Sequence, residues 1–137
     1  MILSINDNKF IIDLQEKFTE CFPYLKIEFF SRPCTPPKMP VFNQLLPVHL
    51  RLGDVRKTHE PGLLDIKSYQ KTGEVEQSFK DLFGLNVQIF RKENEQWVRT
   101  THTKNLTLQQ QSQIAQLTKL SKRNVHEIVE EGNYGYL

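Results

Sequence analysis

The chain has 137 residues, of which 38% are apolar and 25% charged, proportions typical of one globular domain with a single core. The formal net charge of +2, from 18 basic and 16 acidic residues, excludes a strong overall field for gathering nucleic acid or anionic lipid. No apolar run approaches the roughly 20 residues of a membrane span, and residues 1–7 lack the basic start and apolar stretch of a signal peptide. These features predict a cytoplasmic protein.

The first part of the chain predicts a helix followed by a strand. We expect Asn6 or Asp7 to cap the helix, and Pro23 to end it. Apolar residues recur at helical spacing between them, at Phe10, Ile11, Leu14, Phe18 and Phe22. Residues 25–29 then alternate in polarity, which predicts a half-buried strand, and a short strand over residues 1–5 is an option.

Residues 32–47 predict an irregular loop because they contain five of the seven prolines, Pro33, Pro36, Pro37, Pro40 and Pro47. A loop of this length in a compact domain is either mobile or functional. The segment 36–40 fits a polyproline ligand for an aromatic groove, but a flexible connector is the commoner interpretation, and it is the one we favour.

The middle of the chain predicts two further strands and a second helix. A short strand is expected over residues 48–52 and a better-marked one over residues 62–69, between turn residues. Thr72 is expected to cap the helix, and Gly84 to end it in a left-handed conformation. The buried face of this helix is predicted to contain Val75, Phe79, Leu82 and Phe83.

Residues 87–92 and 96–101 predict a two-stranded antiparallel ribbon with a polar turn near Asn94 and Glu95. Both alternating faces of its first strand mix apolar and polar groups, so periodicity leaves open which face is buried. A last helix follows, with Thr107 and Gln110 at the spacing of a capping box. Its predicted buried side contains Leu108, Ile114, Leu117 and Leu120, and residues 125–137 are expected to form a tail that either docks or stays mobile.

The ribbon region also carries a recognisable block of residues. The block consists of Phe83-Gly84-Leu85, Val87-Gln88, Phe90-Arg91-Lys92, Trp97, Thr100-Thr101, Thr103, Thr107-Leu108 and Gln111. Over roughly residues 72–111, it resembles a family of small uncharacterised bacterial proteins in which it usually forms the C-terminal half. The family has no assigned activity, so the resemblance implies a bacterial cytoplasmic α+β domain and supplies no catalytic residue. Lys104-Asn105 stands where the family has an acidic residue, which puts any shared ion-binding role in doubt.

The sequence predicts no metal site and no cofactor. The four histidines, His49, His59, His102 and His126, are scattered and lack the spacing of a metal-binding pattern. The isolated glycines form no phosphate-binding loop. Cys21 and Cys34 lack paired spacing, so both are expected to be free thiols, with Cys21 on the inner side of the first helix.

The ribbon is the best candidate for a binding site because it interleaves cations with aromatic rings. The candidate residues are Phe90, Arg91, Lys92, Trp97, Arg99 and His102. Such a combination neutralises phosphates and stacks bases on a β-surface. In the competing interpretation, which we favour because the net charge is small, Trp97 and Phe90 belong to the core and the cations form a protective edge.

We therefore predict a single α+β domain, with an antiparallel or mixed sheet of about four strands and about three helices mainly on one face. The first functional hypothesis is a non-enzymatic interaction or adaptor domain that binds a partner protein or a second copy through residues 87–102 and the proline-rich loop. The second is nucleic-acid binding on the same ribbon. The third is a small enzyme of unknown reaction with Cys34 or His102 in its site. The exposure of Trp97 decides whether the ribbon belongs to the core or to a binding surface.

Overall fold

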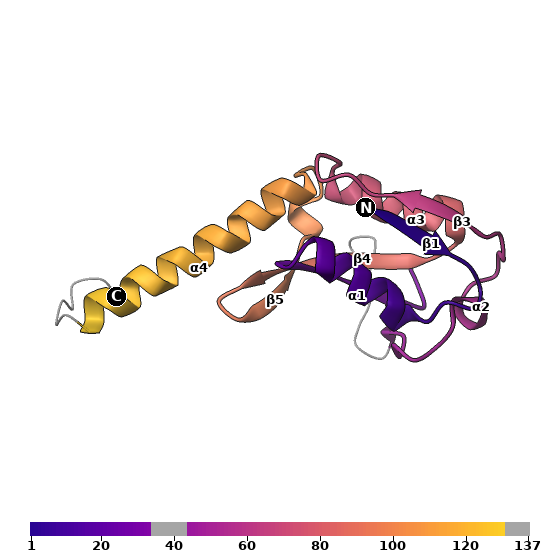
Figure 1. The fold of residues 1–137 in the computed structure, drawn as a ribbon, viewed down its shortest axis with the longest axis horizontal. Coiled ribbons are helices and arrows are strands. Elements are labelled where there is room, and N and C mark those ends of the chain that lie inside the picture. The colour runs from indigo at the N-terminus through magenta and orange to yellow at the C-terminus, as the bar shows by residue number, and fades with distance from the viewer. Residues whose placement is uncertain (34–43, 131–137) are drawn as a thin grey trace.

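The computed structural model describes residues 1–33 and 44–130, with residues 121–130 described as backbone only. Its elements are β1 (Ile2–Ile5), α1 (Ile11–Cys21), β2 (Leu25–Phe30), α2 (Leu52–Val55), β3 (Gly62–Asp65), α3 (Thr72–Phe83), β4 (Asn86–Glu93), β5 (Gln96–Arg99), the 3-10 turn η2 (Thr101–Thr103) and α4 (Leu108–Glu130) (Figure 1). Most of the proline-rich loop predicted over residues 32–47, including Cys34, lies outside the described residues.

The predicted α+β class is confirmed, but the strands are divided between two antiparallel sheets. One contains β1 and β3, and the other has the order β2-β4-β5. In the larger sheet, Ile27 pairs with Ile89, and Phe90 pairs with Lys26 on one side and with Arg99 on the other. The prediction of about four strands in one sheet was therefore only approximate.

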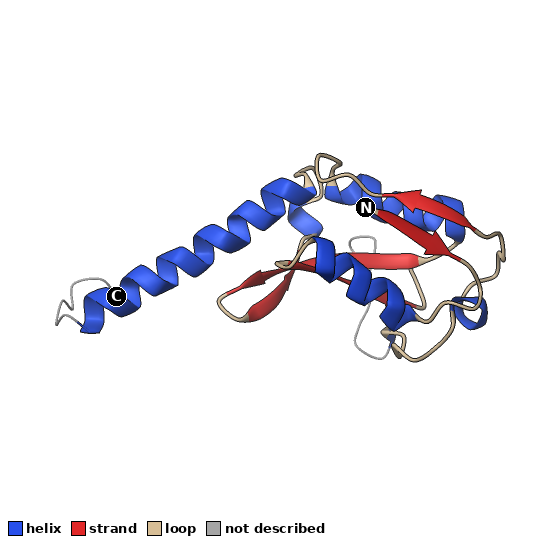
Figure 2. Ribbon diagram, viewed as in Figure 1, coloured by secondary structure: helices blue, strands red, loops and turns tan. Residues whose placement is uncertain are grey.

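Both sheets and the helices α1 and α3 bury their apolar side chains in one core. Figure 2 shows these elements arranged around it. The largest fully buried rings in it are those of Phe18, Phe29 and Phe79. Phe29 from β2 meets Phe79 from α3 edge to face, with ring centroids 6.1 Å apart, a favoured geometry for aromatic pairs. This contact fixes α3 against the inner face of the larger sheet.

The start of α1 differs from the prediction. The helix begins at Ile11 after Phe10, and the Asp13 carboxylate accepts a hydrogen bond of 2.9 Å from the Phe10 backbone N–H. Asp7 does not cap the helix, because its carboxylate binds side chains from a distant loop. Cys21, at the other end of α1, is exposed, so its predicted position on the inner side was wrong.

The short strand predicted over residues 48–52 is also absent, because this segment forms a turn leading into α2. The Leu50 backbone N–H donates to the Pro47 carbonyl at 3.2 Å, and the Ile11 N–H donates to the Leu50 carbonyl at 3.0 Å. Leu52 is fully buried at the start of α2. Apolar alternation over so few residues therefore reflected one buried turn rather than a strand.

Local signals at the ribbon are confirmed. Gly84 ends α3 with φ of +65°, the left-handed conformation that only glycine adopts without steric cost. Asn94 and Glu95 join β4 to β5 with φ values of +50° and +67°. Two consecutive positive φ values are characteristic of the tight hairpin turns whose twist matches that of the flanking strands.

Helix α4 begins with the predicted capping box. The Thr107 N–H donates to Gln110 Oε1 at 2.9 Å, and the Gln110 N–H donates to Thr107 Oγ1 at 3.1 Å. The helix then extends away from the body as far as Glu130, into the predicted tail (Figures 1 and 2). Leu117 and Leu120 are 65% and 52% exposed, so the predicted buried side was wrong for these two residues. No helix in the described part of the chain is long and apolar enough to span a membrane.

Candidate functional site

The outer face of the sheet β2-β4-β5 brings most of the predicted binding residues together. Strand register places Lys26 beside Phe90, Phe90 beside Arg99, and Lys92 beside Trp97. Because side chains alternate across a strand, these residues project from the same face. The outer sheet face, as we name it, comprises Lys26, Phe30, Phe90, Lys92, Trp97 and Arg99. Lys26 and Phe30 come from β2 and were not among the sequence-predicted site residues.

Trp97 is the most exposed aromatic residue of this face, at 37% of its full accessible surface. The Lys26 and Lys92 ammonium groups lie 5.0 and 6.0 Å from the centroid of its ring. The Arg99 guanidinium lies 5.6 Å from the centroid of Phe90. Such distances are those of cation–π contacts, which attract each cation to the face of its ring. The interpretation of Trp97 as a core residue was therefore wrong.

Carboxylates compensate the charge of both lysines on the outer sheet face. The Lys26 ammonium lies 3.2 Å from Glu28, and the Lys92 ammonium lies 3.6 Å from Glu95. The resulting surface presents aromatic rings among paired charges rather than an uncompensated basic patch.

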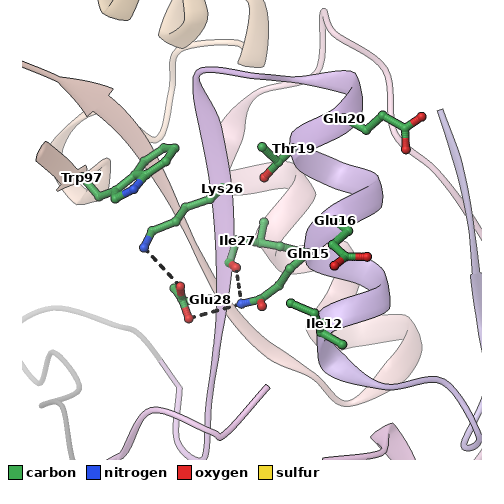
Figure 3. Close-up of a pocket in the computed structure, with 9 residues that line it drawn as sticks. All are labelled: Ile12, Gln15, Glu16, Thr19, Glu20, Lys26, Ile27, Glu28 and Trp97. Carbon is green, nitrogen blue, oxygen red and sulfur yellow. Dashed lines mark hydrogen bonds and ion pairs between the residues drawn. The ribbon is translucent and has the colours of Figure 1, made fainter. Parts of the chain in front are cut away.

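Two hollows adjoin Trp97. A pocket of about 240 Å³ lies over the outer sheet face, between Phe30, Phe90 and the Trp97 ring. A larger and more open groove of about 450 Å³ runs along β2 toward α1 (Figure 3). We call it the edge groove. Ile12, Glu16 and Glu20 of α1 line one flank of it, and Lys26 and Trp97 line the other.

Arg91 points to the opposite face of β4, away from Phe90 and Lys92. Its guanidinium pairs with the Glu93 carboxylate at 2.7 Å and donates to Gln111 Oε1 at 2.8 Å. A further contact of 3.3 Å joins it to Thr103 Oγ1. Arg91 is therefore engaged inside the fold, and we leave it out of the candidate surface.

Gln111 is the centre of this buried network. Its side-chain amide is fully buried and donates to the Thr103 carbonyl at 2.8 Å, to Thr103 Oγ1 at 3.0 Å and to Thr72 Oγ1 at 3.2 Å. The network therefore joins α4 to η2, β4 and the start of α3. Sequence reasoning singled out Gln111 and Thr103 only as part of the family-like block, and assigned neither of them a role.

Glu76 and Thr100 cover the part of β4 that β5 does not reach. Glu76 Oε2 accepts a hydrogen bond of 2.8 Å from the Ile89 N–H, and Thr100 Oγ1 donates to the Ile89 carbonyl at 2.7 Å. Burial raises the pKa of the Glu76 carboxyl, an effect that the Ile89 hydrogen bond and the Lys104 ammonium at 3.2 Å only partly oppose.

A second cluster of charged groups joins the loop after β1 to the loop after α2. Asp7 Oδ1 accepts from Arg56 Nε at 2.9 Å, and Asp7 Oδ2 lies 2.8 Å from His59 Nδ1. Arg56 Nη1 also donates to the Phe83 carbonyl at 3.2 Å, at the end of α3. Burial opposes ionisation of Asp7, but the hydrogen bonds and charges of Arg56 and His59 outweigh it and lower the pKa of the carboxyl. Sequence reasoning missed this cluster because Asp7 and Arg56 are far apart in the chain.

The remaining candidate, His102, is exposed on the turn η2 and does not join the outer sheet face through any described contact. No group of three or more metal-ligating side chains occurs in residues 1–33 and 44–120.

Scans against protein-family models, curated proteins and solved structures find no match to this chain. The resemblance to the small bacterial family therefore stays a prediction, as do the bacterial origin and the cytoplasmic location. Within the described residues, the outer sheet face and the edge groove are the two candidate binding surfaces.

Proposed function

We propose that this chain is a non-enzymatic interaction domain that binds a partner protein, or a second copy of itself, through the outer sheet face. The exposure of the Trp97 ring, at 37%, is the observation that carries the proposal. Tryptophan and arginine are enriched at the energetic centres of protein interfaces.

The geometry around the ring supports this proposal in a second way. Cation–π contacts from Lys26 and Lys92 favour this orientation of the Trp97 ring, which reduces the rotamer entropy lost when a partner covers it. The adjoining pocket of about 240 Å³ offers a hollow for one side chain of the partner. A rigid aromatic residue beside a hollow is a common arrangement for an interface anchor.

A paired-variant capture experiment tests the proposal. The double variant Trp97→Ala, Arg99→Ala removes the centre of the outer sheet face, whereas Tyr69→Ala, Lys57→Ala removes an exposed ring and an exposed cation elsewhere. Cross-linked complexes should be recovered with the parent chain and the control, and be depleted about tenfold with the first variant. Sedimentation of the purified chain distinguishes a second copy from a foreign partner. Equal recovery with both variants would overturn the proposal.

Nucleic-acid binding is the second candidate, favoured by the three cations that flank the two rings. Bases stack on exposed aromatic residues, and phosphates attract neighbouring cations. The ion pairs of Lys26 and Lys92 weaken this candidate, because compensated lysines attract phosphates less strongly. Titration with a labelled single-stranded oligonucleotide tests it. Binding at about 50 mM salt that falls steeply at higher salt would favour it over protein binding.

A further inference from the structure

The sheet β2-β4-β5 has two outer strands, and their edges are bonded differently. Groups from other elements cover the outward carbonyls of β2. Gln15 Nε2 of α1 donates to the Ile27 carbonyl at 2.9 Å, and the Leu46 backbone N–H donates to the Phe29 carbonyl at 2.8 Å (Figure 3). The other outer strand, β5, receives no comparable cover at Trp97 from any described residue.

Alternation along the hairpin directs the backbone of Trp97 to the open side of β5. The Lys92 N–H donates to the Tyr24 carbonyl at 2.9 Å, so the backbone groups of Lys92 point toward β2 and form no ladder bond with β5. The residue opposite Lys92 on β5 is Trp97, whose N–H and C=O therefore point away from β4. Arg99, two residues further on, directs its backbone groups to the same side.

Helix α4 crosses the inner face of the hairpin toward β2 rather than toward β5. Its Gln111 side chain accepts from Arg91 of β4 at 2.8 Å, and its Lys119 ammonium lies 5.8 Å from the centroid of the Tyr24 ring, beside β2. The hairpin itself projects from the body (Figure 2). A strand that approaches β5 from its open side would therefore meet the edge directly.

The sequence of β5 carries few of the features that protect exposed sheet edges. Proteins commonly place proline, lysine or a β-bulge at such an edge, because unpaired backbone groups recruit further strands. β5 reads Gln96-Trp97-Val98-Arg99, and its register with β4 is continuous, without a bulge. Its aromatic and β-branched residues favour strand pairing. The charge opposite Arg99 then determines which strand pairs with it.

A second copy of β5 offers a complementary edge. In an antiparallel pair with its two-fold axis at Trp97, the backbone N–H and C=O of Trp97 in one copy bond those of Trp97 in the other. Arg99 of each copy then lies opposite Glu95 of the other. The Glu95 carboxylate is exposed and lies 3.6 Å from the Lys92 ammonium, which places it on the outer sheet face with the Arg99 guanidinium. Opposite charges therefore face each other on both sides of the two tryptophan rings.

We propose that the chain forms a symmetric dimer in which β5 of one copy pairs antiparallel with β5 of the other, with Trp97 at the two-fold axis. The two three-stranded sheets join into one continuous sheet, and ion pairs between Arg99 and Glu95 fix the register. Aromatic and opposite-charge pairs across neighbouring strands stabilise such an arrangement. The inference rests on the proposed function, since it names a second copy of the chain as the partner of the outer sheet face.

Sedimentation equilibrium of the full chain, from about 1 μM to about 1 mM, tests for the dimer. We expect a monomer–dimer equilibrium with a Kd below about 100 μM. Amide hydrogen exchange measured by NMR locates the interface, because the Trp97 amide should exchange at least about tenfold more slowly when the dimer predominates. The Leu63 amide is the control. The Ile66 N–H donates to the Met1 carbonyl, so alternation directs the Leu63 N–H to the outer edge of β3, where exchange should not change.

A charge swap tests the register. Arg99→Glu alone places like charges opposite each other and should weaken the dimer about tenfold or more. The double variant Glu95→Arg, Arg99→Glu exchanges the two charges and should restore the Kd to within about threefold of the parent value. Arg51→Glu removes an exposed arginine that lies 5.1 Å from the centroid of the Phe10 ring, and this matched control should leave the dimer unchanged. Circular dichroism and thermal melting confirm that the variants fold.

Contrary outcomes are distinct from one another. A chain that stays monomeric up to about 1 mM would overturn the inference, and so would a dimer that keeps its affinity in Arg99→Glu. A dimer that the charge swap does not restore would contradict the register. Slower exchange at Leu63 in place of Trp97 would place the dimer at β3. A monomeric chain whose captured foreign partner is lost in Trp97→Ala, Arg99→Ala would refute the inference and leave the proposed function standing.

Discussion

Neighbouring residues of β4 serve different purposes on the two faces of the ribbon. On the inner face, Arg91 is bound by Glu93 and Gln111 within a polar network that joins four elements. On the outer face, Phe90 lies under Arg99, near the exposed Trp97, beside an open pocket. The comparison shows that cationic and aromatic residues adjacent in a sequence need not act together. Alternation along β4 places Arg91 in the buried network and Phe90 on the proposed binding surface.

The largest effect on stability should come from Gln111→Ala. Removing the amide deletes its buried hydrogen bonds to Arg91, to Thr72 Oγ1 and to the Thr103 carbonyl, each of which contributes about 1 kcal/mol, so we expect a loss of about 3 kcal/mol of unfolding free energy. Urea denaturation measures it. Gln109→Ala, an exposed change two positions away, should alter the free energy by less than about 0.5 kcal/mol. Similar stability of the two variants would mean that the network does not hold α4 to the body.

Glu76→Ala should lower the free energy of unfolding by about 2 kcal/mol, because it leaves the buried Ile89 N–H without an acceptor. Glu76→Gln should cost less, since the amide oxygen can still accept that bond. The raised pKa of Glu76 also predicts how its contribution to the free energy of unfolding changes with pH. The folded state holds the proton more tightly than the unfolded state, so this contribution falls as pH rises from the ordinary carboxyl value through the folded pKa. Stability curves that decline equally in Glu76→Gln would contradict this assignment.

The contribution of Asp7 to stability should depend on pH in the opposite direction. Its folded pKa is lowered, so its contribution is fully present above the ordinary carboxyl value and is lost as pH falls through the folded pKa. Urea midpoints measured from neutral to strongly acidic pH should therefore decline less steeply in Asp7→Asn than in the parent chain. The same decline in both chains would show that the contacts with Arg56 and His59 do not set the pKa.

The smallest effect on stability should come from Trp97→Ala. Although the residue is the largest in the chain, its ring is partly exposed and its cation–π contacts lie at the surface, so we expect a loss of about 1 kcal/mol or less. Thermal melting of this variant and of Trp97→Phe measures it. A loss as large as that of Gln111→Ala would place the ring in the core and would remove the contrast between the two faces.

The sequence predicted those parts of the fold whose signals are local. Gly84 at the end of α3 and the Thr107–Gln110 capping box at the start of α4 depend on residues within one turn of each other. The alternation in β2 was equally clear. By contrast, Leu117 and Leu120 continue the apolar spacing of α4 beyond the body that could bury them, and no local signal reports where that body ends.

Only part of the candidate site could be predicted, for a related reason. Period-two alternation separated Phe90 from Arg91, but the buried face is determined by what packs on it, and Gln111 comes from a different element. Lys26 joined the outer sheet face only through the pairing of β2 with β4. Asp7 looked like a helix cap because its partner Arg56 is far away in the chain. Long-range contacts decided each of these roles.

The strand order has a consequence for folding kinetics. The β4–β5 hairpin is local and could form within microseconds, whereas β2 pairs with β4 across about 60 positions of the chain, a closure that folds slowly. Trp97 and Phe90 belong to the early hairpin, but Lys26 and the groove at β2 do not exist until the slow pairing is complete. A nascent or partly folded chain would therefore display its tryptophan before the rest of the outer sheet face had formed around it, so the proposed binding surface is complete only after the slow pairing.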